Sequence, residues 1–232
     1  MEFAGNPRLS RIDVLRELSR AELLSIERRC RWRRCSRGQL VIDHQGSDRD
    51  VYFLVEGMVR ATVYSHSGRE VTFADIDAGG CFGDLSAIDG RPRSASVVAL
   101  TEVTLASMPP HMFWEVIVDQ PAFATSMLKH LAGIVRRLDD RVVEFSTLGV
   151  QNRIHAELLR LAKAGSAHHG AAVISPVPRH ADIASRVSTN REAVTRELNQ
   201  LARKGILARL PGRLVIQDLQ RLTRMVDESR DA

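Results

Sequence analysis

The stretch RHADIASRVSTNREAVTRELNQLARKGILARLPGRLVIQD, residues 179–218, decides the fold of the second half of the chain. Residues 179–187 carry apolar side chains at helical spacing, STN forms a turn, and a longer amphipathic segment runs from 191 to Gly205. Pro211 and Gly212 then separate two short apolar runs, as in a hairpin. The order helix, turn, helix, hairpin predicts a winged helix-turn-helix.

The second helix of this motif lies in the DNA major groove, with its N-terminal side chains facing the base edges. In this chain those side chains are Arg191, Glu192 and Arg196. Arginine can donate two hydrogen bonds to guanine and a carboxylate can accept one from cytosine, so the set predicts a half-site that contains G·C pairs. The alternative is a salt-bridged helix face in solvent, because Glu192 and Arg196 are four residues apart.

Polar residues around this helix are expected to contact phosphates, which position a protein on DNA without reading its sequence. They are Arg179, Thr189, Asn190, Arg209 and Arg213. The core between the two helices is predicted to consist of Asp182, Ile183, Ala184, Val187, Val194 and Leu198.

The distribution of charge supports a polyanion partner for this part of the chain. Residues 151–232 contain 14 Lys and Arg against 8 Asp and Glu, whereas residues 1–150 contain 19 against 20. Neutralisation of phosphates by such an excess of positive charge supplies much of the affinity of DNA-binding proteins.

The first half of the chain has a different pattern. Residues 10–28 predict helical structure, with Ser19 capping a second short helix. Short apolar runs then alternate with turn residues and predict an antiparallel barrel or sandwich. These runs are LVI (40–42), VYFLV (51–55), MVRATVY (58–64), VTFADI (71–76), SASVVAL (94–100) and VTLASM (103–108).

A long helix is predicted from 122 to 148. Its apolar residues fall on a heptad seam: Met127, Leu131, Ile134, Leu138, Phe145 and Leu148, with Arg141 in the remaining position. A seam of this length predicts a homodimer, and the alternative is a single amphipathic helix packed on its own barrel. The expected domains are therefore 1–121 (effector domain), 122–149 (long helix and hinge) and 150–232 (DNA-binding domain).

Several segments, in order, resemble the Crp/Fnr family of bacterial transcription regulators over nearly the whole chain. FLVEGMVRATVY is similar to a strand and glycine turn of cyclic-nucleotide-binding domains, and CFGDLSAIDGRPRSASVVAL is similar to their phosphate-binding cassette. LGVQNRIHAELLRLA resembles the family hinge, and STNREAVTRELNQLARKGIL resembles its recognition helix. The resemblance implies an α+β protein: an N-terminal antiparallel β-roll, a long dimerisation helix and a C-terminal winged helix-turn-helix. It also implies a cytoplasmic homodimer on a palindromic operator, with RNA polymerase as a further partner.

The same resemblance assigns roles within the cassette. Gly83 lets a backbone amide approach the phosphate, Arg93 pairs with its charge, Ser94 adds donors, and Asp84 accepts from the ribose 2′-hydroxyl. Leu85, Ser86 and Ala95 complete the predicted ligand-binding segment. The chemistry agrees, because a cyclic phosphate needs a cation and amides whereas a sugar hydroxyl needs an anionic acceptor.

The sequence departs from the family pattern at two places. The cassette has Asp84 where the family usually has glutamate. The cAMP-responsive members also place Thr and Ser on the long helix, where alignment puts Leu138 and Asp139. A carboxylate facing the base accepts two hydrogen bonds from guanine, so the effector is expected to be cGMP or cAMP, with cyclic di-GMP as a further candidate. The alternative places Asp139 on a solvated flank, paired with Arg136, Arg137 or Arg141.

Other classes of function are disfavoured by the sequence. The three cysteines do not form a cluster suited to zinc or iron–sulfur ligation, so no metal is expected. Cys30 and Cys35 lie in RRCRWRRC, where arginines could lower a thiol pKa, and a redox role is a minor alternative. The sequence lacks a long apolar run and a secretory pattern, so no membrane association is expected. No catalytic constellation is present, and an enzyme is not expected. Two rivals remain: a DNA-binding regulator without an effector, and a nucleotide-sensing module that acts on a protein.

Overall fold

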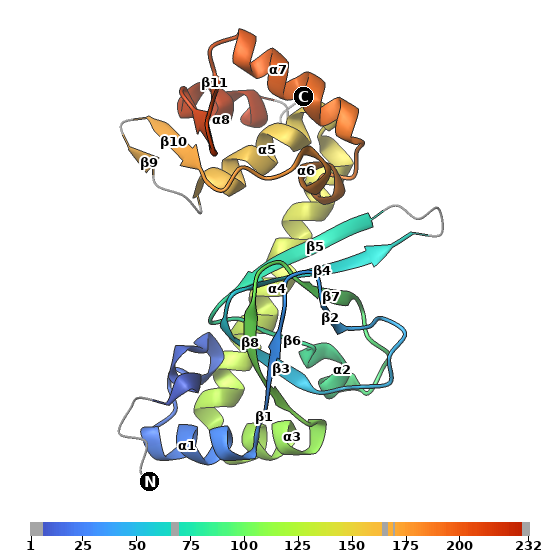
Figure 1. The fold of residues 1–232 in the computed structure, drawn as a ribbon, viewed down its shortest axis with the longest axis vertical. Coiled ribbons are helices and arrows are strands. Elements are labelled where there is room, and N and C mark those ends of the chain that lie inside the picture. Colours follow the sequence, from blue (N-terminus) through green and yellow to red (C-terminus); the bar gives the residue numbers. More distant parts are fainter. Residues whose placement is uncertain (1–6, 66–69, 164–166, 169, 229–232) are drawn as a thin grey trace. The chain divides into compact units, whose positions relative to one another are not determined.

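The computed structural model describes residues 7–65, 70–163, 167–168 and 170–228 (Figure 1). The chain divides into two compact units, residues 1–135 and 136–232. The long helix α4 (Pro121–Thr147) contributes residues to both units. Each unit has a hydrophobic core of its own and is described separately.

Unit 1 is an antiparallel β-roll flanked by helices, as the sequence predicted. Two four-stranded sheets, in the orders β1-β8-β3-β6 and β2-β7-β4-β5, face each other. The strands are β1 (Arg31–Cys35), β2 (Leu40–Ile42), β3 (Val51–Glu56), β4 (Met58–Tyr64), β5 (Glu70–Asp77), β6 (Cys81–Phe82), β7 (Ser96–Ala99) and β8 (Val103–Met108). The helices are two 3₁₀ turns (Arg8–Arg11 and Asp13–Leu15), α1 (Arg20–Arg29), α2 (Asp84–Asp89) and α3 (Pro110–Asp119).

Two cores hold unit 1 together. The first lies between the sheets, where side chains such as Leu54, Val59 and Leu105 are fully buried. The second lies between the β1-β8-β3-β6 sheet and the helices, and it contains Phe53, Phe113 and Phe123. Because residues of a strand alternate between faces, β3 supplies side chains to both cores and is buried at five of its six positions.

The N-terminal segment and two strands differ from the prediction. Ser19 does cap α1, and Glu22 completes the capping box, but the residues before it form 3₁₀ turns rather than a helix. Strand β1 was missed because four of its five residues are exposed, which hides the apolar alternation. Strand β6 was missed because it has only two residues.

The exposed apolar row of α4 shares Leu131, Leu138 and Phe145 with the predicted heptad seam and differs from it by one residue at the alternate positions. Met127 and Leu148 are buried in the cores of their own units, and Arg141 forms ion pairs with Glu144 and Glu157. Six of the apolar side chains that remain exposed or half-exposed also follow a heptad spacing, and we call this set the α4 seam: Leu128, Leu131, Val135, Leu138, Val142 and Phe145. Ile134, which belongs to the predicted seam and is half-buried, and the exposed Val143 lie outside this set.

Unit 2 is the predicted winged helix-turn-helix. After α5 (Val150–Lys163) come β9 (Ala167–His168), β10 (Ala171–Ile174), α6 (His180–Arg186), α7 (Arg191–Arg203), β11 (Leu207–Leu210), β12 (Arg213–Ile216) and α8 (Leu219–Asp227). The β11–β12 hairpin, here called the wing, turns at Gly212 with φ of +67°. The sheet order is β11-β12-β10-β9, so β12 is bonded on both sides. The predicted core residues Ile183, Val187, Val194 and Leu198 are buried, whereas Asp182 accepts from the Arg179 amide.

Candidate functional site

The predicted cassette, residues 83–95, begins at a glycine that has no room for a side chain. Gly83 has φ of +80° and precedes the short helix α2. A Cβ atom there would lie 2.7 Å from Arg93 Nη1 and 2.8 Å from the Asp50 carbonyl oxygen. The missing side chain therefore allows Arg93 to pass directly against the backbone.

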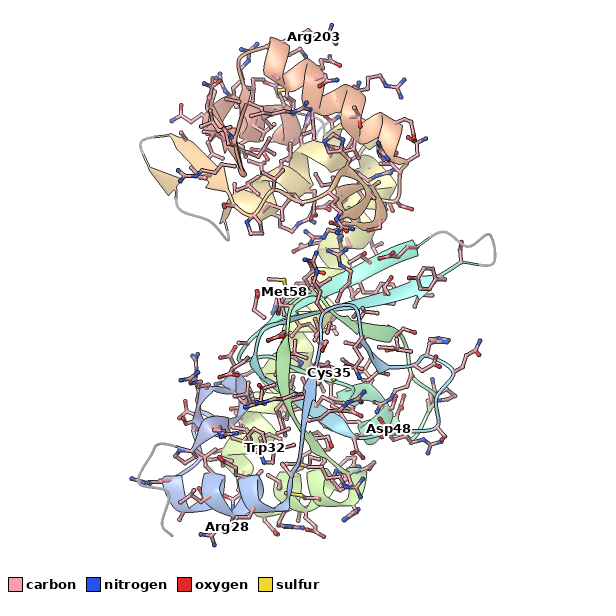
Figure 2. All side chains as sticks on the ribbon, in the orientation of Figure 1. Arg28, Trp32, Cys35, Asp48, Met58 and Arg203 are labelled. Atoms are coloured by element: carbon pink, nitrogen blue, oxygen red, sulfur yellow. The ribbon has the colours of Figure 1, made fainter. Side chains whose placement is uncertain are left out.

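Arg93 is buried and is held by three acceptors. Its Nη1 donates to the Gly83 carbonyl at 2.9 Å, and its Nη2 donates to the Asp50 carbonyl and to Asp48 Oδ2, both at 2.9 Å. Figure 2 shows Asp48 on the loop that precedes β3. Asp48 Oδ2 also accepts from the Tyr52 hydroxyl at 2.7 Å. Burial opposes the charge of Asp48, but hydrogen bonds from Tyr52, the Asp50 amide and Arg93 together lower its pKa.

Asp84 lies at the start of α2, beside α4. Its Oδ2 atom is 3.7 Å from His130 Nε2, and His130 Nε2 is 3.7 Å from Cys81 Sγ. Burial raises the pKa of Asp84, against the opposing effects of His130, two backbone amides and Arg93. No sequence pattern links His130 to the cassette, because a lone histidine on a long helix is not distinctive.

Two buried polar atoms of the cassette have no hydrogen-bond partner among the described residues. One is the donor Arg93 Nε, and the other is the acceptor Asp84 Oδ2. Unpaired buried polar atoms are costly and uncommon in proteins. A ligand with an anionic group and a hydroxyl could satisfy both, because the anion accepts from Nε and the hydroxyl donates to Oδ2.

The other predicted ligand residues are placed as follows. Within the cassette, Ser86 and Ala95 are buried, whereas Leu85 and Ser94 are exposed. On α4, Leu138 and Asp139 are exposed, and Leu138 belongs to the α4 seam. The proposed pairing of Asp139 with Arg141 is not formed, because Arg141 pairs with Glu144 and Glu157.

Helix α7 presents an arginine-rich face to solvent. Asn190 caps the helix by accepting from the Ala193 amide at 2.8 Å, so this predicted phosphate contact also has a structural role. Val194, Leu198 and Leu201 are buried on the opposite face. The exposed face borders a shallow hollow of about 440 Å³ and consists of Arg191, Glu192, Thr195, Arg196, Asn199 and Arg203.

The structure therefore brings the three predicted base-reading residues together and adds others to the same face. Arg191, Glu192 and Arg196 are all exposed, and Arg203 lies at the C-terminal end of α7 (Figure 2). Asn199 and Arg203 were missed, although their spacing of three and seven residues from Arg196 places them on this face.

A second cavity lies between α6, α7 and the wing. Two of the predicted phosphate contacts, Arg209 and Arg213, line it with His180, Ile183, Leu198 and other apolar residues. Arg179 is exposed and Thr189 is half-buried at the turn before α7. His180 was not singled out in the sequence, because only the fold brings it between the two helices and the wing.

The two cysteines of RRCRWRRC lie inside hydrophobic cores. Cys30 and Cys35 are buried and belong to different hydrophobic cores. Burial, aided by Glu27, raises the pKa of Cys30 to about 12, which outweighs the opposite effect of Arg29. For Cys30, burial therefore argues against the minor alternative of a redox role and favours a buried thiol. In the part of the chain that the structure describes, no group of three His, Cys, Asp or Glu side chains is arranged to bind a metal, and no helix could cross a membrane.

Comparison with known proteins agrees with both units. Residues 32–120 match the cyclic nucleotide-binding domain family, and residues 152–225 match the Crp-like helix-turn-helix domain. The chain is 31% identical over 176 residues to the CRP-like cAMP-activated global transcriptional regulator of Mycobacterium tuberculosis, covering 75% of this chain and 78% of that protein. The chain belongs to the Crp/Fnr family.

Other relatives are transcription regulators of the same kind. The chain is 27% identical to the transcriptional regulator SdrP of Thermus thermophilus, covering 76% of this chain and 83% of that protein. A mutant of CooA from Carboxydothermus hydrogenoformans has the same fold, with a TM-score of 0.79 at 21% identity and coverage of 97% and 98%. The chain is thus a Crp/Fnr-type regulator with a cyclic nucleotide-binding domain and a DNA-binding helix-turn-helix.

Proposed function

We propose that the protein is a homodimer that binds a palindromic DNA operator through α7 and is controlled by a cyclic nucleotide bound at the cassette. RNA polymerase would be a further partner. The observation that carries the DNA-binding part is the row of exposed arginines on α7, opposite the face that packs in the core of unit 2. Paired recognition helices that enter successive major grooves require half-sites about 34 Å apart.

Selection of duplexes from a random-sequence pool tests the recognition helix. Replacing Arg191 and Arg196 together by alanine should weaken binding to the selected duplex by about 30-fold or more, because each bidentate contact to guanine contributes about 1–3 kcal/mol. The matched control replaces Arg31 and Arg34 of β1, which are also exposed, by alanine and should retain the affinity for the selected duplex. Equal losses in both variants would show that α7 contributes only charge.

The α4 seam supports the homodimer. Leu128, Val135 and Val142 are 68%, 55% and 64% exposed, respectively, and they lie seven residues apart. Such a stripe buries apolar area when a second copy pairs with it. In sedimentation analysis, the wild type should have twice the mass of the chain, and Val135→Asp should shift it to the monomer. Val118→Asp on α3, at a position 75% exposed and outside the seam, should remain dimeric.

The two unpaired atoms of the cassette support the effector. Arg93 Nε would donate to a cyclic phosphate, Gly83 would let a backbone amide approach it, and Ser94 would add a hydroxyl. Asp84 Oδ2 would accept from the ribose 2′-hydroxyl. Leu138 and Asp139 are proposed to face the base, and the carboxylate favours cGMP over cAMP. Relatives support two nucleotide classes: the M. tuberculosis protein is named as cAMP-activated, and the regulator CLP of Xanthomonas campestris, at 19% identity and a TM-score of 0.72, as c-di-GMP-responsive.

Titration calorimetry against cAMP, cGMP and cyclic di-GMP tests this part. Arg93→Lys keeps the positive charge but removes Nε, so it should weaken nucleotide binding. Asp139→Ser should lower the preference for cGMP. If no nucleotide binds the wild type or changes its DNA affinity, the protein is an effector-independent regulator. If a nucleotide binds but no duplex is selected, the protein is a sensing module that acts on a protein partner.

A further inference from the structure

We propose that the cavity between α6, α7 and the wing binds a backbone phosphate of DNA, and that His180 takes up a proton when the phosphate enters. The inference rests on the proposed DNA-binding function and deepens it, because it makes the affinity for DNA depend on pH. It would allow the regulator to bind its sites more tightly as the pH falls.

The hydrogen bonds around His180 define which ring nitrogen carries the proton. The Thr195 hydroxyl donates to the Arg191 carbonyl oxygen at 2.9 Å, so its hydrogen is already used. His180 Nδ1 lies 2.6 Å from the same hydroxyl oxygen. With the Thr195 hydroxyl donating to the Arg191 carbonyl oxygen, Nδ1 is assigned as the donor in this contact, and the neutral ring then carries its hydrogen there.

The other ring nitrogen is the one that changes. Nε2 has no hydrogen-bond partner among the described residues, and in the neutral ring it is only an acceptor. A phosphate oxygen is also only an acceptor, so it would be repelled by the Nε2 lone pair. When His180 is protonated, Nε2 becomes a charged donor and can form a charge-assisted hydrogen bond to the phosphate.

The surroundings of the cavity suit an anion. Its volume is about 220 Å³, and its charged lining consists of Arg209 and Arg213 from the wing, with His180 between them and α7. No acidic side chain lines it, and Arg191 adds positive charge from α7. Arg179, the residue that precedes α6, is exposed, and Asp182 of α6 accepts a hydrogen bond from the Arg179 amide.

The same surroundings favour the neutral form of His180 in the free protein. Burial is the main cause that lowers the pKa of His180, followed by the charges of Arg209 and Arg191. A phosphate in the cavity would offset those two arginines and favour the charged ring. Because the protein–DNA complex then binds one more proton than its separated parts, the affinity rises as the pH falls.

Fluorescence anisotropy with the selected duplex, at constant ionic strength from pH 8 to pH 6, tests the proposal. The wild type should bind more tightly at pH 6 than at pH 8 by up to about tenfold, which is the limit for a bound pKa about one unit above the free pKa. Calorimetric titrations in two buffers of different ionisation enthalpy should show proton uptake on binding.

Three variants test whether His180 causes the pH dependence of DNA binding. His180→Gln should lose most of the pH dependence, whereas His180→Arg should bind at pH 8 about as tightly as the wild type does at pH 6. His111→Gln, at an exposed position on α3, should keep the wild-type dependence. An unchanged pH dependence in His180→Gln, or its absence in the wild type, would overturn the proposal while leaving the DNA-binding function intact. A wild type that binds no duplex at any pH would instead overturn the proposed function itself.

Discussion

Glu157 should be the most sensitive charged position in unit 2. Its side chain is 4% exposed and faces three arginines from three helices. Arg160 and Arg186 donate hydrogen bonds to it, the latter at 2.9 Å, and Arg141 is 3.7 Å away. A charge-assisted hydrogen bond contributes about 1.5–3 kcal/mol, and loss of one member of a buried pair costs about 3–5 kcal/mol. Because Arg160 also binds Glu144 at 2.8 Å, we expect Glu157→Gln to cost about 3 kcal/mol.

Urea unfolding can assign this loss to the correct unit. Both tryptophans, Trp32 and Trp114, lie in unit 1, so their fluorescence reports that unit, whereas far-ultraviolet circular dichroism reports both. Glu157→Gln should lower the midpoint of the unit 2 transition in circular dichroism by about 1–2 M urea and leave the tryptophan transition unchanged. Glu115→Gln is the control, because its pair with Arg29 is about half exposed and should contribute less than about 1 kcal/mol. If the losses of unfolding free energy caused by Glu157→Gln and Glu115→Gln differ by less than about 0.5 kcal/mol, the reasoning from burial is refuted.

Three further results are expected in unit 1. Gly83→Ala should destabilise the protein by about 2 kcal/mol in thermal unfolding and weaken nucleotide binding, whereas Gly90→Ala should destabilise it by only about 1 kcal/mol. Both glycines have positive φ, but only Gly83 also faces close contacts. Equal losses of stability in the two variants would contradict the role of these contacts. Burial raises the pKa of Asp84, so the folded state disfavours its charged form and stability falls as the pH rises through that pKa. Asp84→Asn should therefore raise the melting temperature at pH 7 while weakening the proposed ribose contact. A lower melting temperature would argue against an unfavourable buried charge at Asp84. The pKa of Cys30 is raised to about 12, so iodoacetamide should modify Cys30 at pH 8 only after the protein unfolds. Mass spectrometry can detect this modification. Rapid labelling of the folded protein would contradict the prediction, because it would reveal an exposed thiolate.

The spacing of apolar residues predicted most elements of the fold, because these residues are the ones that strands and helices bury. The six apolar runs correspond to strands β2, β3, β4, β5, β7 and β8, and the two helices of the DNA-binding motif lie where predicted. Strand β1 could not be found in this way, because its residues are bonded to β8 but project exposed arginines. Its stability comes from backbone pairing, which leaves no alternation in the sequence.

For the α4 seam, the sequence alone does not distinguish between two possible heptad rows. Two heptad rows that differ by one residue share Leu131, Leu138 and Phe145, and both contain mainly apolar residues. Only the tertiary structure distinguishes them, because Met127 is used by the core of unit 1 and Arg141 by the ion pairs of unit 2. The free positions are therefore Leu128, Val135 and Val142.

The predicted site residues depended on chemistry that could be read from neighbours in the sequence. Asp84 and Arg93 were assigned through the resemblance of one short segment, which contains both, to the phosphate-binding cassette. Arg93 pairs with Asp48, which lies on a loop 45 residues before it, and Asp84 lies near His130, which is on a helix 46 residues after it. No local pattern specifies such contacts, and the folded backbone is needed to reveal them.

The position of β12 in the sheet of unit 2 limits how the DNA-reading part can be transplanted. This strand bonds to β11 within the wing and to β10, which precedes the helix-turn-helix. Helix α8 then places Leu222 and Val226 in cores that also contain residues of α5. A fusion protein that borrows only α6, α7 and the wing would leave an open strand edge and uncovered apolar surface. A chimaera that joins this recognition helix to another sensor therefore has to begin before Val150 and continue through Asp227.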